Sequence, residues 1–123
     1  QFEVVEPFKT VHQCHCGRCR RARAAAHATN GFTSMEGTVF TKGETKIKTY
    51  KVPKAKHFSH AFCGTCGSGM PRVDPSRQIA VTPLGSLDDD PVFRPVHNIF
   101  VASKAAWYKI TDGLPEYAEM PPA

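Results

Sequence analysis

The stretch "CHCGRC", residues 14–19, places three of the chain's five cysteines within six positions. If this segment begins as a strand, Cys14 and Cys16 point to the same side, and the gap before Cys19 lets the chain turn and present a third sulfur. Thiolates favour Zn²⁺, whose tetrahedral shell takes donors at about 2.3 Å. We therefore predict that Cys14, Cys16 and Cys19 bind one zinc ion and leave a coordination position for water or a substrate thiol.

The other two cysteines lie in "CGTCG", residues 63–67, which has the form of a zinc knuckle. Cys63 and Cys66 supply only half of a four-sulfur site, so the knuckle needs further ligands. Three completions are open at this point. The missing ligands lie before Gln1, or His57 or His60 replaces them, or all the cysteines serve a single site.

Disulfide bonds and redox chemistry are weaker interpretations of the same cysteines. The cysteine count is odd, nothing in the sequence resembles an export signal, and cysteines two apart are poor disulfide partners. A redox dithiol at Cys63 and Cys66 lacks the βαβ pattern of thioredoxin-like proteins. Metal binding remains the prediction.

Length and composition indicate one folded domain. The chain has 123 residues, of which 41% are hydrophobic and 22% charged. No run approaches the roughly 20 apolar residues that span a bilayer, so we expect no membrane partner and a cytoplasmic location. The formal net charge of +5 permits attraction to nucleic acid, phosphates or small carboxylates but selects none of them.

The basic residues form two groups with different expected roles. Six lysines are spread over the middle of the chain, where we predict a solvated strand face: Lys42, Lys46, Lys48, Lys51, Lys54 and Lys56. Four arginines surround the first cysteine group: Arg18, Arg20, Arg21 and Arg23. Arginines in this position can balance the charge of a tris-thiolate zinc site and can also hold an anionic ligand beside it.

Residue patterns predict a mostly β domain. Runs rich in β-branched and aromatic residues predict strands at 2–6, 37–43, 46–52, 57–63, 78–87 and 97–104. "TKGETK", residues 41–46, resembles a hairpin turn between the second and third strands. A single short helix is predicted over 19–28, ending before "TNG", and the tail 114–123 is expected to be extended.

The histidines are weaker ligand candidates than the cysteines. His15 lies between two predicted ligands, and on a strand its side chain points away from the ion, toward solvent or a hydrogen-bond partner. His97 lies in an apolar strand, where a lone histidine is more typically a satisfied interior group. We nevertheless retain His97 as a candidate substrate-binding residue and, with Asp88, as a weak candidate for acid–base chemistry.

Three segments together resemble a known family. They are "CHCGRCRRA" at 14–22, "FCGTCGSGM" at 62–70 and "VTPLGSLDDDPVFRPVHNIFVASKAAWYKITDGLPEYAE" at 81–119. Their order and spacing are similar to the glutathione-dependent formaldehyde-activating enzyme family, which shares a domain with centromere protein V and has the Mss4-like fold. The resemblance covers the whole chain as a single zinc-binding domain, residues 1–123.

The resemblance implies a set of coiled β-sheets stabilised by two zinc sites. Cys14, Cys16 and Cys19 would form the open, catalytic-type site, and Cys63 and Cys66 would belong to a structural site. In the family an upstream CxC pair completes the structural site, so this chain is expected to lack a short N-terminal segment that carries it. Structural zinc contributes on the order of 10 kcal/mol to small domains.

One departure from the family pattern lies beside the expected pocket. Family members commonly carry a small polar residue and a glycine after the "CRRA" stretch, whereas this chain has Arg23 and Ala24. A bulky cation therefore replaces a small group at this place.

The leading functional hypothesis is a zinc-dependent carbon–sulfur lyase that acts on a glutathione-like thiol and an aldehyde. The expected substrate-binding residues are Arg20, Arg21, Arg23 and His97. The alternative is a non-catalytic, zinc-stabilised module that contacts protein or nucleic acid. Against nucleic acid, the cationic residues are not interleaved with stacking aromatics, and no groove-reading helix is visible.

Overall fold

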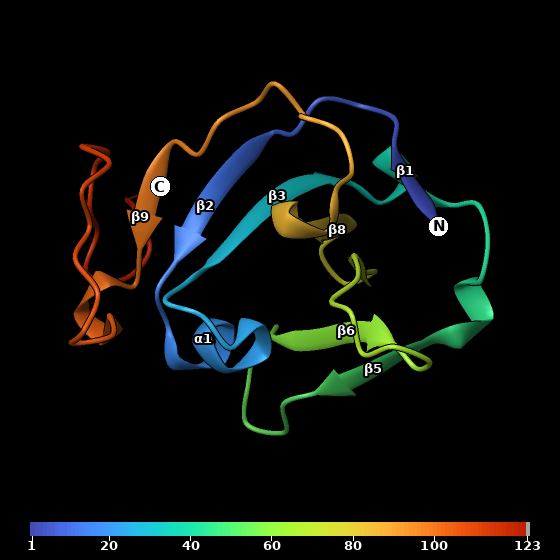
Figure 1. Cartoon of the computed structure of the whole chain (residues 1–123), viewed down its shortest axis with the longest axis horizontal. Helices are drawn as coiled ribbons and strands as arrows, with labels where there is room; N and C mark the ends of the chain where they lie inside the picture. Colours follow the sequence, from blue (N-terminus) through green and yellow to red (C-terminus); the bar gives the residue numbers. More distant parts are fainter. Residues whose placement is uncertain (123) are drawn as a thin grey trace.

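A computed structural model describes residues 1–122 and shows a mostly β protein with several sheets and, within those residues, one α-helix (Figure 1). The predicted fold class is confirmed. The strands are β1 (Phe2–Val4), β2 (Thr10–Cys14), β3 (Ala28–Ser34), β4 (Thr38–Phe40), β5 (Ile47–Lys51), β6 (Ser59–Cys63), β7 (Arg72–Asp74), β8 (Ile79–Pro83) and β9 (His97–Ile99). The helices are α1 (Gly17–Arg23) and the 3₁₀ turns η1 (Met35–Gly37), η2 (Glu44–Lys46), η3 (Leu84–Ser86) and η4 (Val101–Ser103).

A five-stranded sheet forms the centre of the molecule, with strand order β7-β8-β3-β2-β9. β2 pairs with β3 in antiparallel register, so that Cys14 lies opposite Ala28, and pairs with β9 in parallel register, so that Cys14 lies opposite Ile99. α1 follows β2 directly and lies close to β6 in the view of Figure 1. The cysteine segment therefore begins on a central strand of the main sheet.

The predicted hairpin between residues 37–43 and 46–52 is wrong. β4 pairs with β1, and β5 pairs with β6, each as a separate two-stranded antiparallel sheet. The intervening residues 41–46 are all exposed and contain η2, so this segment links two sheets instead of closing one. The residue types of this segment are typical of a turn. They do not determine which strands pair, because strand pairing depends on contacts with segments distant in the sequence.

The helix is shorter than predicted, and a strand follows it. α1 ends at Arg23, and Ala24 adopts the left-handed conformation (φ 49°, ψ 48°) with its N–H directed at the last carbonyls. Residues 28–34, part of which the sequence assigned to the helix and its cap, form β3 in the middle of the main sheet. Burial between β2 and β8 outweighs the weak strand propensity of "ATNGFTS".

Replacing Ala24 with glycine is expected to stabilise the protein by about 1 kcal/mol. A positive φ places the Cβ of an L-residue close to backbone atoms, and glycine has no such penalty. Chemical denaturation of the two proteins measures the difference. The matched control is Ala25→Gly, which gains no relief of this kind and should be neutral or slightly destabilising; equal effects from both substitutions would contradict the interpretation.

The thiols belong to the hydrophobic core. Cys14 and Cys19 are 6% and 5% exposed and cluster with Ala28 and Ile99. The six lysines of the middle segment are all exposed, but only Lys48 and Lys51 lie on a strand, so the predicted strand face is wrong. Among the described residues, no helix has the length and apolar character needed to cross a bilayer.

The C-terminal tail is extended, as predicted, and is hydrogen-bonded to β9. The Asn98 N–H donates to the Pro115 carbonyl at 2.8 Å, and the Tyr117 N–H donates to the Asn98 carbonyl at 2.9 Å. The Phe100 N–H donates to the Glu119 carbonyl at 3.0 Å. The tail is thereby fixed beside the strand that neighbours Cys14.

Candidate metal centre

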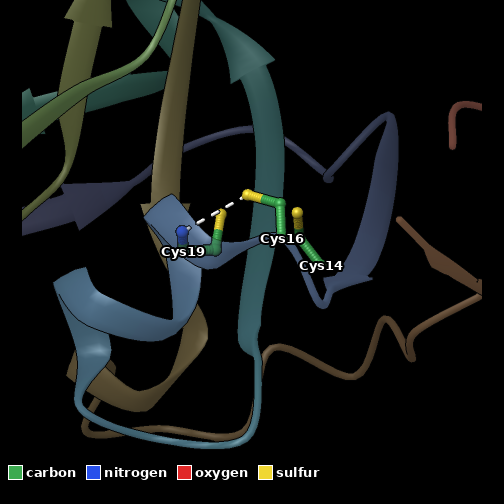
Figure 2. Close-up of side chains that lie close together, drawn as sticks. All are labelled: Cys14, Cys16 and Cys19. Carbon is green, nitrogen blue, oxygen red and sulfur yellow. Dashed lines mark hydrogen bonds between the residues drawn. The ribbon is translucent and has the colours of Figure 1, made fainter. Parts of the chain in front are cut away.

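Three thiols converge where β2 gives way to α1. Cys14 is the last residue of β2, Cys16 is the N-cap of α1, and Cys19 lies in the first helical turn. The Cys16 sulfur accepts a hydrogen bond from the Cys19 backbone N–H at 3.3 Å. Figure 2 shows the three side chains gathered together, with all three sulfur atoms within 4.8 Å of one another.

This donor set fits a thiophilic metal ion. Tetrahedral geometry with metal–sulfur bonds of about 2.3 Å requires sulfur–sulfur spacings of about 3.8 Å, which a small inward movement of these side chains provides. Among residues 1–122, no other cysteine, histidine or carboxylate joins the group. An ion bound by these three thiolates alone would keep a fourth position for an exogenous ligand, so the open site stays a prediction.

The three thiols lie close enough to shift one another's pKa. Hydrogen bonds from the Cys14 and Cys19 thiols lower the pKa of Cys16. The hydrogen bond to Cys16 raises the pKa of Cys14 to about 11, and hydrogen bonds with Cys14 and Cys16 raise the pKa of Cys19. The three sulfurs are therefore near enough for the protonation of one thiol to affect the other two.

Aromatic side chains pack against the buried cluster to which two of the thiols belong. Phe58, Phe100 and Tyr117 are partly buried and pack against the cluster that contains Cys14 and Cys19. They come from the segment before β6, from the end of β9 and from the tail. The resulting surroundings exclude part of the water and strengthen electrostatic interactions at the sulfurs.

Two half-buried arginines, Arg23 on α1 and Arg72 on β7, have no carboxylate partner among the described residues. Arg23 Nη1 lies 3.3 Å from His60 Nδ1, and the Arg72 guanidinium lies 5.5 Å from the centre of the Phe58 ring. The ion pairs among the described residues involve other arginines. Burial lowers the pKa of both Arg23 and Arg72. Partly buried guanidinium groups of this kind favour a bound anion.

A cavity of about 620 Å³ lies beside Arg23 at the end of α1 and Ala28 at the start of β3. The thiols do not line it, but Ala28 does, and Ala28 packs against Cys14 and Cys19. Its lining residues are Arg23, His27, Ala28, Thr29, Ser68, Gly69, Met70, Pro83, Gly85 and Ser86. Arg23 therefore lines the cavity and lies on the same helix as Cys19.

The other predicted substrate-binding residues lie elsewhere. Arg20 is half-buried, and its Nε has no hydrogen-bond partner among the described residues, whereas Arg21 is exposed. His97 Nε2 contacts His12 Nδ1 across the parallel β2–β9 pair. None of these three predicted residues lines the cavity with Arg23.

Cys63 and Cys66 form a separate, more exposed knuckle. The Cys63 sulfur accepts from the Thr65 N–H at 3.4 Å, and the backbone N–H groups of Cys66 and Thr65 lower the pKa of Cys63 to about 7. No third ligand joins this pair within residues 1–122, so neither a histidine substitute nor a single five-cysteine site is formed. An upstream ligand pair stays a prediction.

Comparison with known proteins identifies the family. Residues 1–103 match the model of the family described as glutathione-dependent formaldehyde-activating enzyme. The chain belongs to this family. The resemblance drawn from the cysteine motifs and the C-terminal pattern is thereby confirmed.

The fold of this formaldehyde-activating enzyme family member is also found in a solved structure. The crystal structure of a Rhodobacter sphaeroides protein is 20% identical, with a TM-score of 0.55, and the match covers 73% of this chain and 79% of that chain. At this identity the likeness concerns the fold alone. No curated protein matches the chain.

Sequence reasoning missed part of the site in this family member. Arg72 and Phe58 were not singled out, because neither lies within a cysteine motif, although "GMPRV" directly follows the knuckle. His27, a lining residue of the cavity, was also missed. Burial lowers the pKa of His27. Phe58 precedes the knuckle and Arg72 follows it, so only a motif extending to both sides of the knuckle could have included the two residues.

Proposed function

We propose that the protein is a zinc-dependent carbon–sulfur lyase that joins a carboxylate-bearing thiol to formaldehyde or a related small aldehyde. The observation that carries this proposal is the buried group of Cys14, Cys16 and Cys19, which has no fourth protein donor among the described residues. Family membership supports the same chemistry. A closed, four-ligand site would have favoured a purely structural role.

The reaction is an addition that balances without an oxidant or reductant. The thiol sulfur loses its proton and attacks the aldehyde carbon, forming the carbon–sulfur bond. The π pair of the carbonyl moves to oxygen, which takes up one proton to give a hydroxyalkyl thioether. When bound by the three thiolates, zinc would supply a Lewis acid that keeps the substrate thiol deprotonated at neutral pH.

The chain's own residues bind and orient the thiol. Phe58, Phe100 and Tyr117 pack against the buried cluster that contains Cys14 and Cys19, and these apolar surroundings strengthen charge interactions at the sulfurs. Arg23 and Arg72, which have no carboxylate partner in the described chain, supply hydrogen-bond donors for a substrate carboxylate. A glutathione-like molecule carries both the thiol and the carboxylates that this arrangement requires.

Turnover measurements test the proposal directly. Zinc-loaded protein should accelerate the loss of free formaldehyde in the presence of glutathione, and chelator treatment followed by zinc should abolish and restore the rate. The product is followed by the NMR signal of the new S–CH₂–O group. No acceleration above buffer by fully zinc-loaded protein would overturn the proposed activity.

Replacing Arg23 with methionine is expected to raise the KM for glutathione about 10- to 100-fold. Methionine keeps much of the side-chain volume but removes a charge-assisted hydrogen bond. The KM for 2-mercaptoethanol, which has no carboxylate, should change little. Arg21→Met is the matched control, since Arg21 is exposed on the same helix. Equal changes for both thiols would refute a carboxylate-binding role.

We also propose a reducing compartment such as the cytoplasm as the place of action. All five cysteines are free thiols in the structure, and the reaction requires those of the first cluster to stay reduced. Oxidation would remove the metal ligands.

A further inference from the structure

A chain of side-chain hydrogen bonds connects the C-terminal segment to the residue between two of the thiols. Asn98 Nδ2 donates to both carboxylate oxygens of Asp112 at 3.2 Å, and Asn98 Oδ1 lies 2.8 Å from His15 Nε2. Because the amide nitrogen is engaged by the carboxylate, the amide oxygen faces the ring and accepts a hydrogen bond. This arrangement places the proton of His15 on Nε2.

The members of this chain are firmly held. His15 and Asn98 are fully buried, and the His15 backbone N–H donates to the Ile99 carbonyl at 3.0 Å. Asp112 is exposed but is oriented by the Leu114 N–H, which donates to its Oδ1 at 3.0 Å. The Asp112 carboxylate is therefore the surface end of a hydrogen-bond chain whose other members, Asn98 and His15, are buried.

The position of His15 links this connection to the thiols. His15 separates Cys14 from Cys16, at the point where the strand ends and the helix begins. Its Nδ1 is buried and has no hydrogen-bond partner among the described residues, so the bond to Asn98 is the polar anchor of the ring. A change in the orientation of His15 would shift the backbone that carries both neighbouring sulfurs.

We infer that Asp112, acting through Asn98 and His15, is a positioning residue that sets the metal affinity of the three-cysteine site. This inference rests on the metal binding contained in the proposed function. The role is assigned from the hydrogen bonds that join Asp112 to Asn98 and Asn98 to His15. Partners that orient a metal site indirectly typically change its affinity 10- to 100-fold, which is roughly the expected range here.

The test compares the zinc-loaded full chain with Asp112→Ala. Zinc affinity, measured by competition with a chromophoric chelator, should fall about tenfold. Asn98 is then free to turn its amide, so two-bond ¹⁵N–¹H NMR should show His15 shifting from the Nε2–H tautomer toward Nδ1–H. The tautomer signal reports on the connection itself, independently of activity.

Two further variants separate positioning from general effects. Asp112→Asn keeps an oxygen that can accept from Asn98 and should retain most of the zinc affinity. Glu116→Ala removes an exposed carboxylate from the same segment and should change neither signal.

Each outcome decides the inference. Unchanged zinc affinity in Asp112→Ala, or a loss of affinity without a tautomer change, would overturn the positioning role while leaving the proposed function intact. The same loss in Glu116→Ala would also overturn it. Wild-type protein that binds no zinc would overturn both proposals.

Discussion

Cys16→Ser is expected to abolish zinc binding at the three-cysteine site and to lower turnover of thiol and formaldehyde by on the order of 10³-fold. Cys16 is the N-cap of α1, and its sulfur accepts a hydrogen bond from the Cys19 N–H at 3.3 Å. A hydroxyl is a much poorer zinc ligand than a thiolate. Metal analysis and steady-state rates of the zinc-equilibrated proteins measure the two effects.

Cys66→Ser is the matched control for this prediction. Cys66 is exposed and belongs to the separate knuckle, and its thiol donates to Ser68 Oγ at 3.1 Å. Its replacement should mainly lower stability and should leave zinc at the first cluster. If both serine variants lost structure equally and retained equal activity per folded molecule, the division into a functional and a structural cysteine group would be wrong.

Gly31→Ala is expected to destabilise the protein by about 3 kcal/mol. Gly31 is buried on β3, and a Cβ at this position would lie 2.5 Å from Cε1 of the Phe8 ring. Phe8 is itself 5% exposed, so the ring has little room to move. The melting temperature should fall by roughly 10 °C or more, as measured by circular dichroism.

Two variants check the cause of this loss. Gly85→Ala should leave stability almost unchanged, because its Cβ would meet nothing within 4 Å. Combining Gly31→Ala with Phe8→Leu should be less destabilising than the sum of the single changes, since the smaller side chain removes the steric conflict. Strict additivity would argue against contact with Phe8 as the cause.

Local sequence was sufficient for the metal-binding segment. Cys14, Cys16 and Cys19 lie within six consecutive residues, so their spacing in the sequence alone limits how far apart the sulfurs can lie. The end of the helix was less predictable. Its C-terminal residue was placed at 28 instead of Arg23, because the alanines after Arg23 favour a helix whereas β3 requires its residues for the sheet.

The sequence by itself determined the β class, the converging thiols and the family, because these depend on residue types and short spacings. Only the tertiary structure decided which strands pair, that Phe58 packs against the thiol cluster with Arg72 over its ring, and that Asp112 reaches His15 through Asn98. His15 and Asn98 are 83 positions apart in the chain. Contacts over such separations are set by the packing of the whole molecule, and no local pattern of residues specifies them.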